Sequence, residues 1–296
     1  MRKYILFPIV FLLLLCNSVA AKKKDKENVD GPVVKAPSKV EFQRIADSIL
    51  AEGVELYGYE KISWMTSDSA SVYCKNMSDV GRYYVYKDGS AYTCFFTDRK
   101  AENVVFCGKG KIEELASNLQ WSNMVRPLTD EEKEVIKEQS TCLEKLSVAY
   151  GDSIYNMTSA NGSLNVDIIK NKSGYRMYIL QGTTNMGVIP FGNDYILDFD
   201  KDFNITSFKR CHKSYLAIPV EAGKVESSIH SHTPDNPYMT VTDVCTSLLY
   251  GRDLYGIQSF TVYSTHFTGG FMIVFDTNSM AIVGLDSEFI KKVYGK

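Results

Sequence analysis

The stretch KVESSIHSHTPDNPYMTVTDVCTSLL, residues 224–249, carries both the clearest periodicity and the clearest chemistry of this chain. Its first nine residues alternate, with His230 and His232 on one face and Ile229 on the other, which predicts a half-buried strand. Two prolines follow, and then apolar residues recur at the spacing of an amphipathic helix. These residues are Val241, Val244, Cys245, Leu248 and Leu249. The stretch therefore predicts a strand, a short loop and a helix.

His230 and His232 point to the same side of the expected strand, because they are separated by one residue. Asp243 falls in the first turn of the expected helix, on its polar side. Two imidazoles and a carboxylate are ligands that zinc prefers, and three protein ligands leave one coordination position for water. The whole chain has only four histidines, and this pair uses two of them. We therefore expect a zinc site formed by His230, His232 and Asp243.

Two structural interpretations of the same residues stay open. A His-x-His pair can simply line the polar face of a strand. Thr240 stands where a helix N-cap belongs, and Asp243 stands in the first turn, where the helix dipole favours a negative charge.

The segment resembles the JAMM/MPN metalloprotease family, whose motif is His-x-His-Pro, six residues, Ser, two residues, Asp. The resemblance covers the C-terminal half of the chain only. It implies that His230, His232 and Asp243 hold zinc, and that Thr240 takes the place of the serine that stabilises the oxyanion. The proline is displaced by one position, to Pro234. The stretch is also similar to uncharacterised secreted bacterial proteins, which imply no activity.

Catalytic members of that family carry a glutamate general base on a strand before the two histidines. Residues 168–193 of this chain contain no carboxylate, and Gln181 is the nearest analogue. A carboxamide cannot accept the proton from a metal-bound water. Asp194, in a Gly-Asn-Asp turn, is the remaining candidate for the base.

Two functions follow from these observations. The first is a secreted zinc-dependent peptidase or isopeptidase of JAMM type, acting on a peptide or protein in the cell envelope or outside the cell. The second is a catalytically silent MPN-like protein that binds or scaffolds a partner. The missing glutamate favours the second, and the metal ligands favour the first.

The N-terminus predicts secretion. A basic start, an apolar run and a small-residue cleavage region identify 1–21 as a signal peptide, and 22–37 as a polar linker. A lipoprotein attached at Cys16 is the less favoured alternative, because a leucine precedes that cysteine. No later segment is apolar for long enough to span a membrane, so we expect a mature product in the periplasm or outside the cell.

Composition excludes one class of partner and leaves two questions open. The formal net charge of −2 provides no broad basic surface for nucleic acid. Six cysteines follow the signal peptide, and their spacing fixes no disulfide pairing. The oligomeric state is equally undetermined.

The N-terminal half predicts a small domain at 38–127. Ser38 and Glu41 form a capping box at the start of a helix. We expect strands at 60–65, 82–86 and 91–97, the last two joined by a turn at 87–90.

A second capping box at Thr129 starts a helix that runs to about Tyr150 and opens a second domain at 128–296. Strands at 175–181, 194–200 and 206–219 are expected to join the sheet that bears the two histidines. The sequence as a whole predicts an α+β protein of two domains: a helix-plus-antiparallel-sheet domain, and a JAMM/MPN-like mixed sheet with flanking helices.

Overall fold

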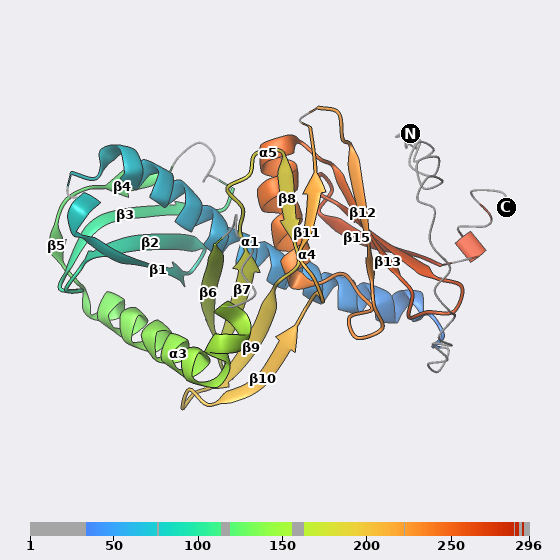
Figure 1. Cartoon of the computed structure of the whole chain (residues 1–296), viewed down its shortest axis with the longest axis horizontal. Helices are drawn as coiled ribbons and strands as arrows, with labels where there is room; N and C mark the ends of the chain where they lie inside the picture. The colour runs from blue at the N-terminus through green and yellow to red at the C-terminus, as the bar shows by residue number, and fades with distance from the viewer. Residues whose placement is uncertain are drawn as a thin grey trace. The chain divides into compact units, whose positions relative to one another are not determined.

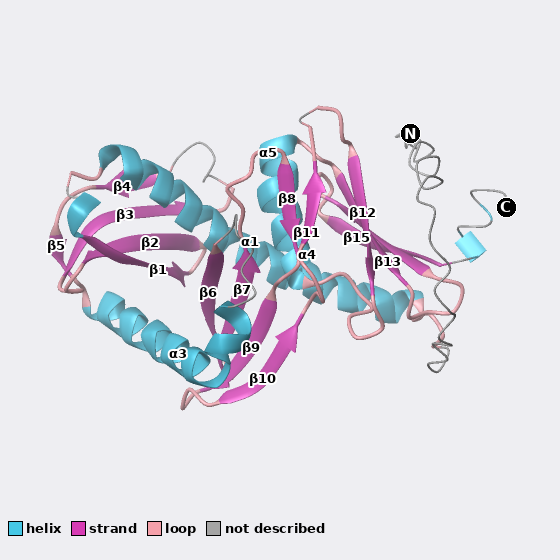
Figure 2. Cartoon of the chain, viewed as in Figure 1, coloured by secondary structure: helices cyan, strands magenta, loops and turns pink. Residues whose placement is uncertain are grey.

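The computed structural model describes residues 34–75, 77–113, 119–155, 163–221, 223–286, 288–289 and 292, within one compact unit that spans Val34–Lys296. An N-terminal helix and sheet precede further sheets and helices along the chain (Figures 1 and 2). This confirms the predicted α+β class, and the arrangement is consistent with a two-domain layout. The boundary between residues 127 and 128 stays a prediction, and the expected signal peptide at 1–21 lies outside the described residues.

Helix α1 (Lys39–Tyr73) begins where the sequence predicted. The hydroxyl oxygen of Ser38 accepts a hydrogen bond from the backbone N–H of Glu41 at 3.2 Å, which satisfies an amide of the first turn. The predicted strand at 60–65 is wrong, because the helix continues through it. The middle of α1 contacts the N-terminal sheet as well as the C-terminal helix α4 (Val241–Thr246). Burial on several sides removes the one-sided stripe by which a surface helix is recognised.

The N-terminal sheet follows α1 and confirms the predicted hairpin. Its strands are β1 (Val80–Asp88), β2 (Ala91–Asp98), β3 (Asn103–Lys111), β4 (Gln120–Ser122) and β5 (Arg126–Pro127), after a short 3-10 helix η2 (Met77–Asp79). Asp88 pairs with Ala91 across a two-residue turn, in which Gly89 has a φ of 58°. A positive φ is the conformation that such a tight hairpin turn requires, and glycine adopts it without strain.

Helix α3 (Asp130–Tyr155) opens with the predicted capping box. The backbone N–H of Glu132 donates to the Thr129 hydroxyl oxygen, and the backbone N–H of Thr129 donates to the Glu132 carboxylate. Cys142 and Leu146 on its inner side are fully buried against the sheet that follows.

The strands expected beside the histidine pair form separate sheets, so that part of the prediction is wrong. One antiparallel sheet has the order β10-β9-β7-β6. Its strands are β6 (Leu164–Asn171), β7 (Gly174–Gln181), β9 (Tyr195–Asp200) and β10 (Ile205–Arg210). A two-stranded sheet pairs β8 (Val188–Phe191) with β11 (Leu216–Pro219). The chain leaves one sheet and enters the next within a few residues at 211–215, and no periodicity in the sequence marks that change of partner.

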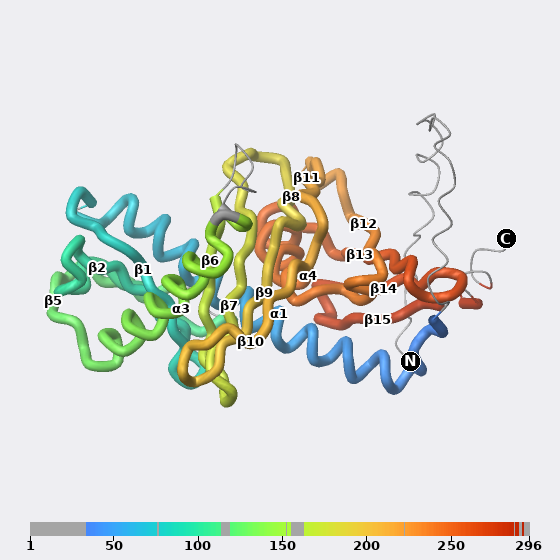
Figure 3. The backbone as a smooth tube through the Cα atoms, turned by 60° about the horizontal axis from the view of Figure 1, so that its bottom comes forward, coloured from blue at the N-terminus to red at the C-terminus, as the bar shows by residue number. Residues whose placement is uncertain are grey.

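The C-terminal sheet is mixed and bears the histidine pair. Its strands are β12 (Ser227–His232), β13 (Ser259–Ser264), β14 (Phe271–Asp276) and β15 (Ala281–Asp286). β12 lies at the edge and pairs in parallel with β13, whereas the other two pairings are antiparallel. The helical segment α4, η3 (Ser247–Arg252, a π-helix) and α5 (Asp253–Tyr255) connects β12 to β13, as a parallel pair requires (Figure 3).

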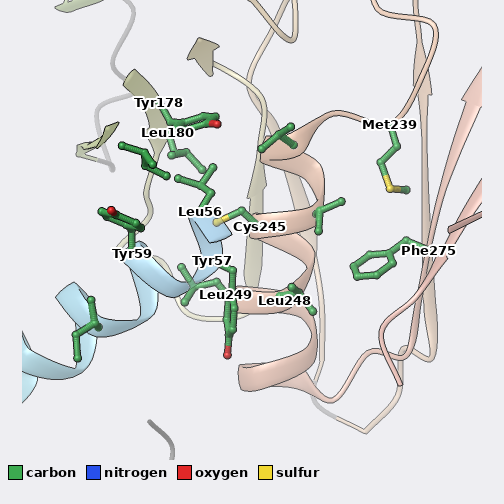
Figure 4. Packing of buried hydrophobic residues seen from close by; sticks show 14 of the residues in the cluster. Leu56, Tyr57, Tyr59, Tyr178, Leu180, Met239, Cys245, Leu248, Leu249 and Phe275 are labelled. Carbon is green, nitrogen blue, oxygen red and sulfur yellow. The ribbon is translucent and has the colours of Figure 1, made fainter. Parts of the chain in front are cut away.

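Close packing against α1 holds α4 in place. Figure 4 shows Leu56 of α1 beside Cys245 and Leu249 in the same buried cluster. A Cβ at Gly53 would lie 2.5 Å from the Val244 Cβ, so the two helices approach too closely for any larger residue. The first turn of α4 is therefore fixed by the core of the protein.

No described helix is long and apolar enough to cross a membrane.

Candidate metal centre

The strand β12 presents its two histidines to the protein interior. Burial alternates along it: His230 and His232 are buried, whereas Ile229 before them and Ser231 between them are exposed. The apolar residue of the strand faces outward, and the histidines face inward, which reverses the ordinary preference of each residue type. Buried imidazoles need polar partners, so the interior beside β12 is specialised.

Asp243 reaches the same place from the first turn of α4. The backbone N–H and the hydroxyl of Thr240 both donate to its Oδ2, at 2.7 and 2.8 Å. Its Oδ1 has no hydrogen-bond partner within the described part of the chain, although the side chain is only 1% exposed. An ionised oxygen buried without a hydrogen bond is costly unless a cation faces it, and that cation can be a metal ion or a protonated imidazole.

His212 completes the cluster and was not predicted. It lies between β10 and β11, and its Nδ1 is 2.8 Å from Asp194 Oδ1. The residue stands 18 positions before His230 in a segment without regular structure, so no motif spacing links it to the other ligands. The scarcity of histidine is the one signal that pointed to it, because three of the four in the chain meet here.

The four residues His212, His230, His232 and Asp243, which we call the metal centre, aim one atom each at a common point. His232 Nε2 lies 2.9 Å from His212 Nε2 and 3.0 Å from His230 Nε2. Asp243 Oδ1 lies 3.2 Å from His212 Nε2 and 3.3 Å from His230 Nε2. Ligands at about 2.0–2.1 Å from a tetrahedral zinc ion are separated by about 3.3 Å. These four separations are close to that value, and all four atoms lie within 4.8 Å of one another, so the cluster could hold a metal ion.

Surrounding groups fix the orientation of the imidazoles. His232 Nδ1 lies 2.7 Å from the Tyr238 carbonyl oxygen and 3.0 Å from that of Asn236, so it carries the proton. His212 Nδ1 donates to Asp194 in the same way, and the Thr242 hydroxyl donates to the other oxygen of that carboxylate. When Nδ1 carries the only proton of the ring, the Nε2 of His212 or His232 has a free lone pair for a metal.

The charges of the metal-free cluster are strongly coupled. Burial lowers the pKa of His212, but the nearby carboxylates of Asp194 and Asp243 outweigh it and raise that pKa to about 11. Burial also lowers the pKa of His232, and the neighbouring imidazoles lower it further. Burial opposes ionisation of Asp243, yet His212, His232 and His230 together hold its pKa well below the usual range. The cluster thus keeps an ionised carboxylate in the interior by surrounding it with imidazoles.

The two residues expected to act in catalysis have other partners. Thr240 is the N-cap of α4, and its hydroxyl and N–H are engaged with Asp243 in a capping box. Asp194 accepts a hydrogen bond from His212 Nδ1, on the side of the ring away from the metal centre, so it does not face an open coordination position. Gln181 donates to the Gly182 carbonyl oxygen and accepts from Asn193. The cap interpretation and the metal interpretation of Thr240 and Asp243 are therefore compatible, since one carboxylate oxygen serves each.

The chain matches no protein-family model, no curated protein and no solved structure.

Proposed function

We propose that the protein binds one zinc ion through the metal centre. The single observation that carries this proposal is the buried Oδ1 of Asp243, which makes no hydrogen bond in the described residues and lies 3.2 and 3.3 Å from the Nε2 atoms of His212 and His230. Three nitrogens and one oxygen in this arrangement suit zinc better than the harder cations, which prefer oxygen ligands throughout.

The same geometry favours a structural role for the ion. Four protein ligands fill a tetrahedral shell, and structural zinc sites are closed in this way, whereas catalytic sites keep a position open. The ligands come from β12, from α4 and from the segment between β10 and β11, so the ion would cross-link three parts of the chain. We therefore propose a secreted, catalytically silent MPN-like protein that binds or scaffolds a protein partner.

A JAMM-type peptidase or isopeptidase is the second candidate, and one observation favours it. The His212 side chain is 12% exposed, against 5% or less for the other three ligands. If His212 left the centre, the remaining three residues would be the ligand set that the family resemblance implies, and Asp194 would lose its imidazole partner. A bound zinc ion polarises a carbonyl group and lowers the pKa of water. Asp194 could then accept a proton, the role for which the strand before it offers no carboxylate.

Zinc content and peptidase activity of the full chain separate these candidates. Wild type and His266→Ala should each carry one zinc ion, because His266 is the one histidine outside the centre, and His232→Ala should carry none. For a structural site, His212→Ala should bind zinc more weakly, melt earlier and cleave no peptide. Peptidase activity that appears in His212→Ala, with zinc retained, would instead establish the hydrolase. Wild-type protein that takes up no zinc would refute both.

A further inference from the structure

A second buried polar cluster lies between α1 and β6 and shares no residue with the metal centre. Glu60 of α1 and Asp167 of β6 are 4% and 5% exposed. Asn165, two residues before Asp167 on the same face of the strand, donates to Glu60 Oε2 at 2.9 Å. Two carboxyl groups are thus enclosed where helix α1 meets strand β6, and the neutral amide of Asn165 donates to one of them.

Neither Glu60 nor Asp167 pairs with a lysine or arginine among the described residues. Burial raises the pKa of Glu60 and, more strongly, that of Asp167, which the neighbouring Glu60 raises further through a shared hydrogen bond. Two adjacent carboxyls in such surroundings hold a proton between them. Asp167 Oδ2 nevertheless has no hydrogen-bond partner in the described residues. The pair therefore keeps an unused acceptor in the interior.

A cavity of about 320 Å³ opens directly onto Glu60. Three aromatic residues line it, and the rings of Trp64 and Tyr250 lie 5.5 Å apart at 42°, with Tyr83 as the third. Hydroxyl side chains and Asn165 form the rest of the lining together with Gly182, and Glu60 is the only residue with a charge among those described. A volume near 300 Å³ is at the lower end of the range for small-molecule sites.

We infer that this cavity, which we call the acid pocket, binds a small organic ammonium ion. An ammonium group is attracted to the faces of aromatic rings, and a desolvated cation gains most from them. It also supplies positive charge beside two enclosed carboxyls, which a neutral sugar or polyol would not. The single carboxylate in the lining and the absence of any lysine or arginine from the described lining residues both select for a cation.

Calorimetry on the full chain tests this inference, with choline as the probe. Its uncharged isostere 3,3-dimethylbutanol and glucose serve as comparison ligands. Choline should bind at one site, and the isostere should bind at least about tenfold more weakly, because it fills the same space without a charge. Glu60→Gln should weaken choline binding at least about tenfold, and Asp68→Asn should not change it, because Asp68 is an exposed acid on the same helix.

Two further variants keep the result interpretable. Trp64→Leu should also weaken choline binding, because it retains an apolar side chain but removes the aromatic face. His266→Ala should bind choline as wild type does, since His266 belongs neither to the acid pocket nor to the metal centre. Equal binding of choline and the isostere, binding of glucose alone, or no binding of choline to wild type would each overturn the inference. A thermal melt that shows a folded Glu60→Gln protein makes its loss of binding decisive.

Discussion

The metal centre and the acid pocket both bury ionisable side chains, but they satisfy them in opposite ways. In the metal centre, three imidazoles surround the Asp243 carboxylate, and hydrogen bonds from Nδ1 orient the rings of His212 and His232. At the acid pocket, Glu60 in the lining meets the buried Asp167 behind it, and no lysine or arginine of the described residues pairs with either carboxyl.

An enclosed polar cluster can therefore indicate its ligand in two ways. Where imidazole lone pairs converge at coordination spacing and the second nitrogen of each ring is already hydrogen-bonded, the geometry favours a metal ion. Where like charges meet beside aromatic rings, only the charge and the space are specified, and an organic cation fits both.

Removal of the Asp243 carboxylate, which serves both the metal centre and the cap of α4, should have the largest effect. Asp243→Ala takes away one ligand and the acid of the α4 capping box, and it leaves buried imidazoles without their counter-charge. We expect loss of zinc binding and a fall in the free energy of unfolding of about 3–5 kcal/mol. Asp235→Ala is the control, because its side chain is 67% exposed in the loop after β12. Chemical denaturation with parallel zinc analysis measures both effects, and normal zinc binding by Asp243→Ala would exclude that residue as a ligand.

Weakening the hydrogen bond between Asp194 and His212 should have a smaller effect. Asp194→Asn keeps the shape of the side chain but weakens the hydrogen bond that orients the imidazole. We expect zinc affinity to fall about 10–100-fold, as for other outer partners of metal ligands. Competition with a chelator measures that affinity, and the exposed Asp202→Asn is the matched control. An unchanged affinity would show that Asp194 does not position His212.

Proton competition at His212 should make zinc affinity depend on pH. The pKa of His212 in the metal-free protein is raised to about 11, so this imidazole is protonated at neutral pH and must lose a proton to bind a metal. Zinc affinity should therefore rise about tenfold per pH unit between pH 7 and 9. Calorimetry in buffers of different ionisation enthalpy should show about one proton released per ion. Release of no proton would contradict a ligand role for His212.

Neutralisation of the acid pocket should produce the smallest effect, and it should be stabilising. The pKa values of Glu60 and Asp167 are raised in the folded protein, so their contribution to stability is present below their unfolded values and is lost as pH rises through the folded ones. Glu60→Gln should be more stable than wild type by about 1 kcal/mol at pH 8, with a smaller difference at pH 5. Denaturation at the two pH values tests this, with Asp68→Asn as control. Equal destabilisation of Glu60→Gln at both pH values would be incompatible with a strained acid pair.

Local signals predicted the parts of the fold that depend on few neighbours. The caps at Ser38, Thr129 and Thr240 lie where the sequence placed them, because a cap is a contact between residues three apart. The turn at Gly89 follows from two residues alone. The strand expected at 60–65 failed for the opposite reason, because burial of α1 against two other elements determines that segment.

The same rule explains which parts of the metal centre the sequence could predict. One strand–helix unit contains His230, His232 and Asp243, so their spacing along the sequence predicts that they meet. His212 enters from a segment between two sheets, Asp194 orients it across 18 residues of chain, and Thr242 donates to Asp194 across 48. Such contacts depend on how the sheets are connected, and periodicity along the chain contains no information about that.

X-ray absorption at the zinc edge, on wild-type protein loaded with one equivalent of zinc, tests the central claim most directly. We predict four nitrogen or oxygen neighbours at about 2.0–2.1 Å, with the scattering pattern of three imidazoles. A shell made mainly of water oxygens, or protein that leaves the zinc in solution, would contradict the proposed centre.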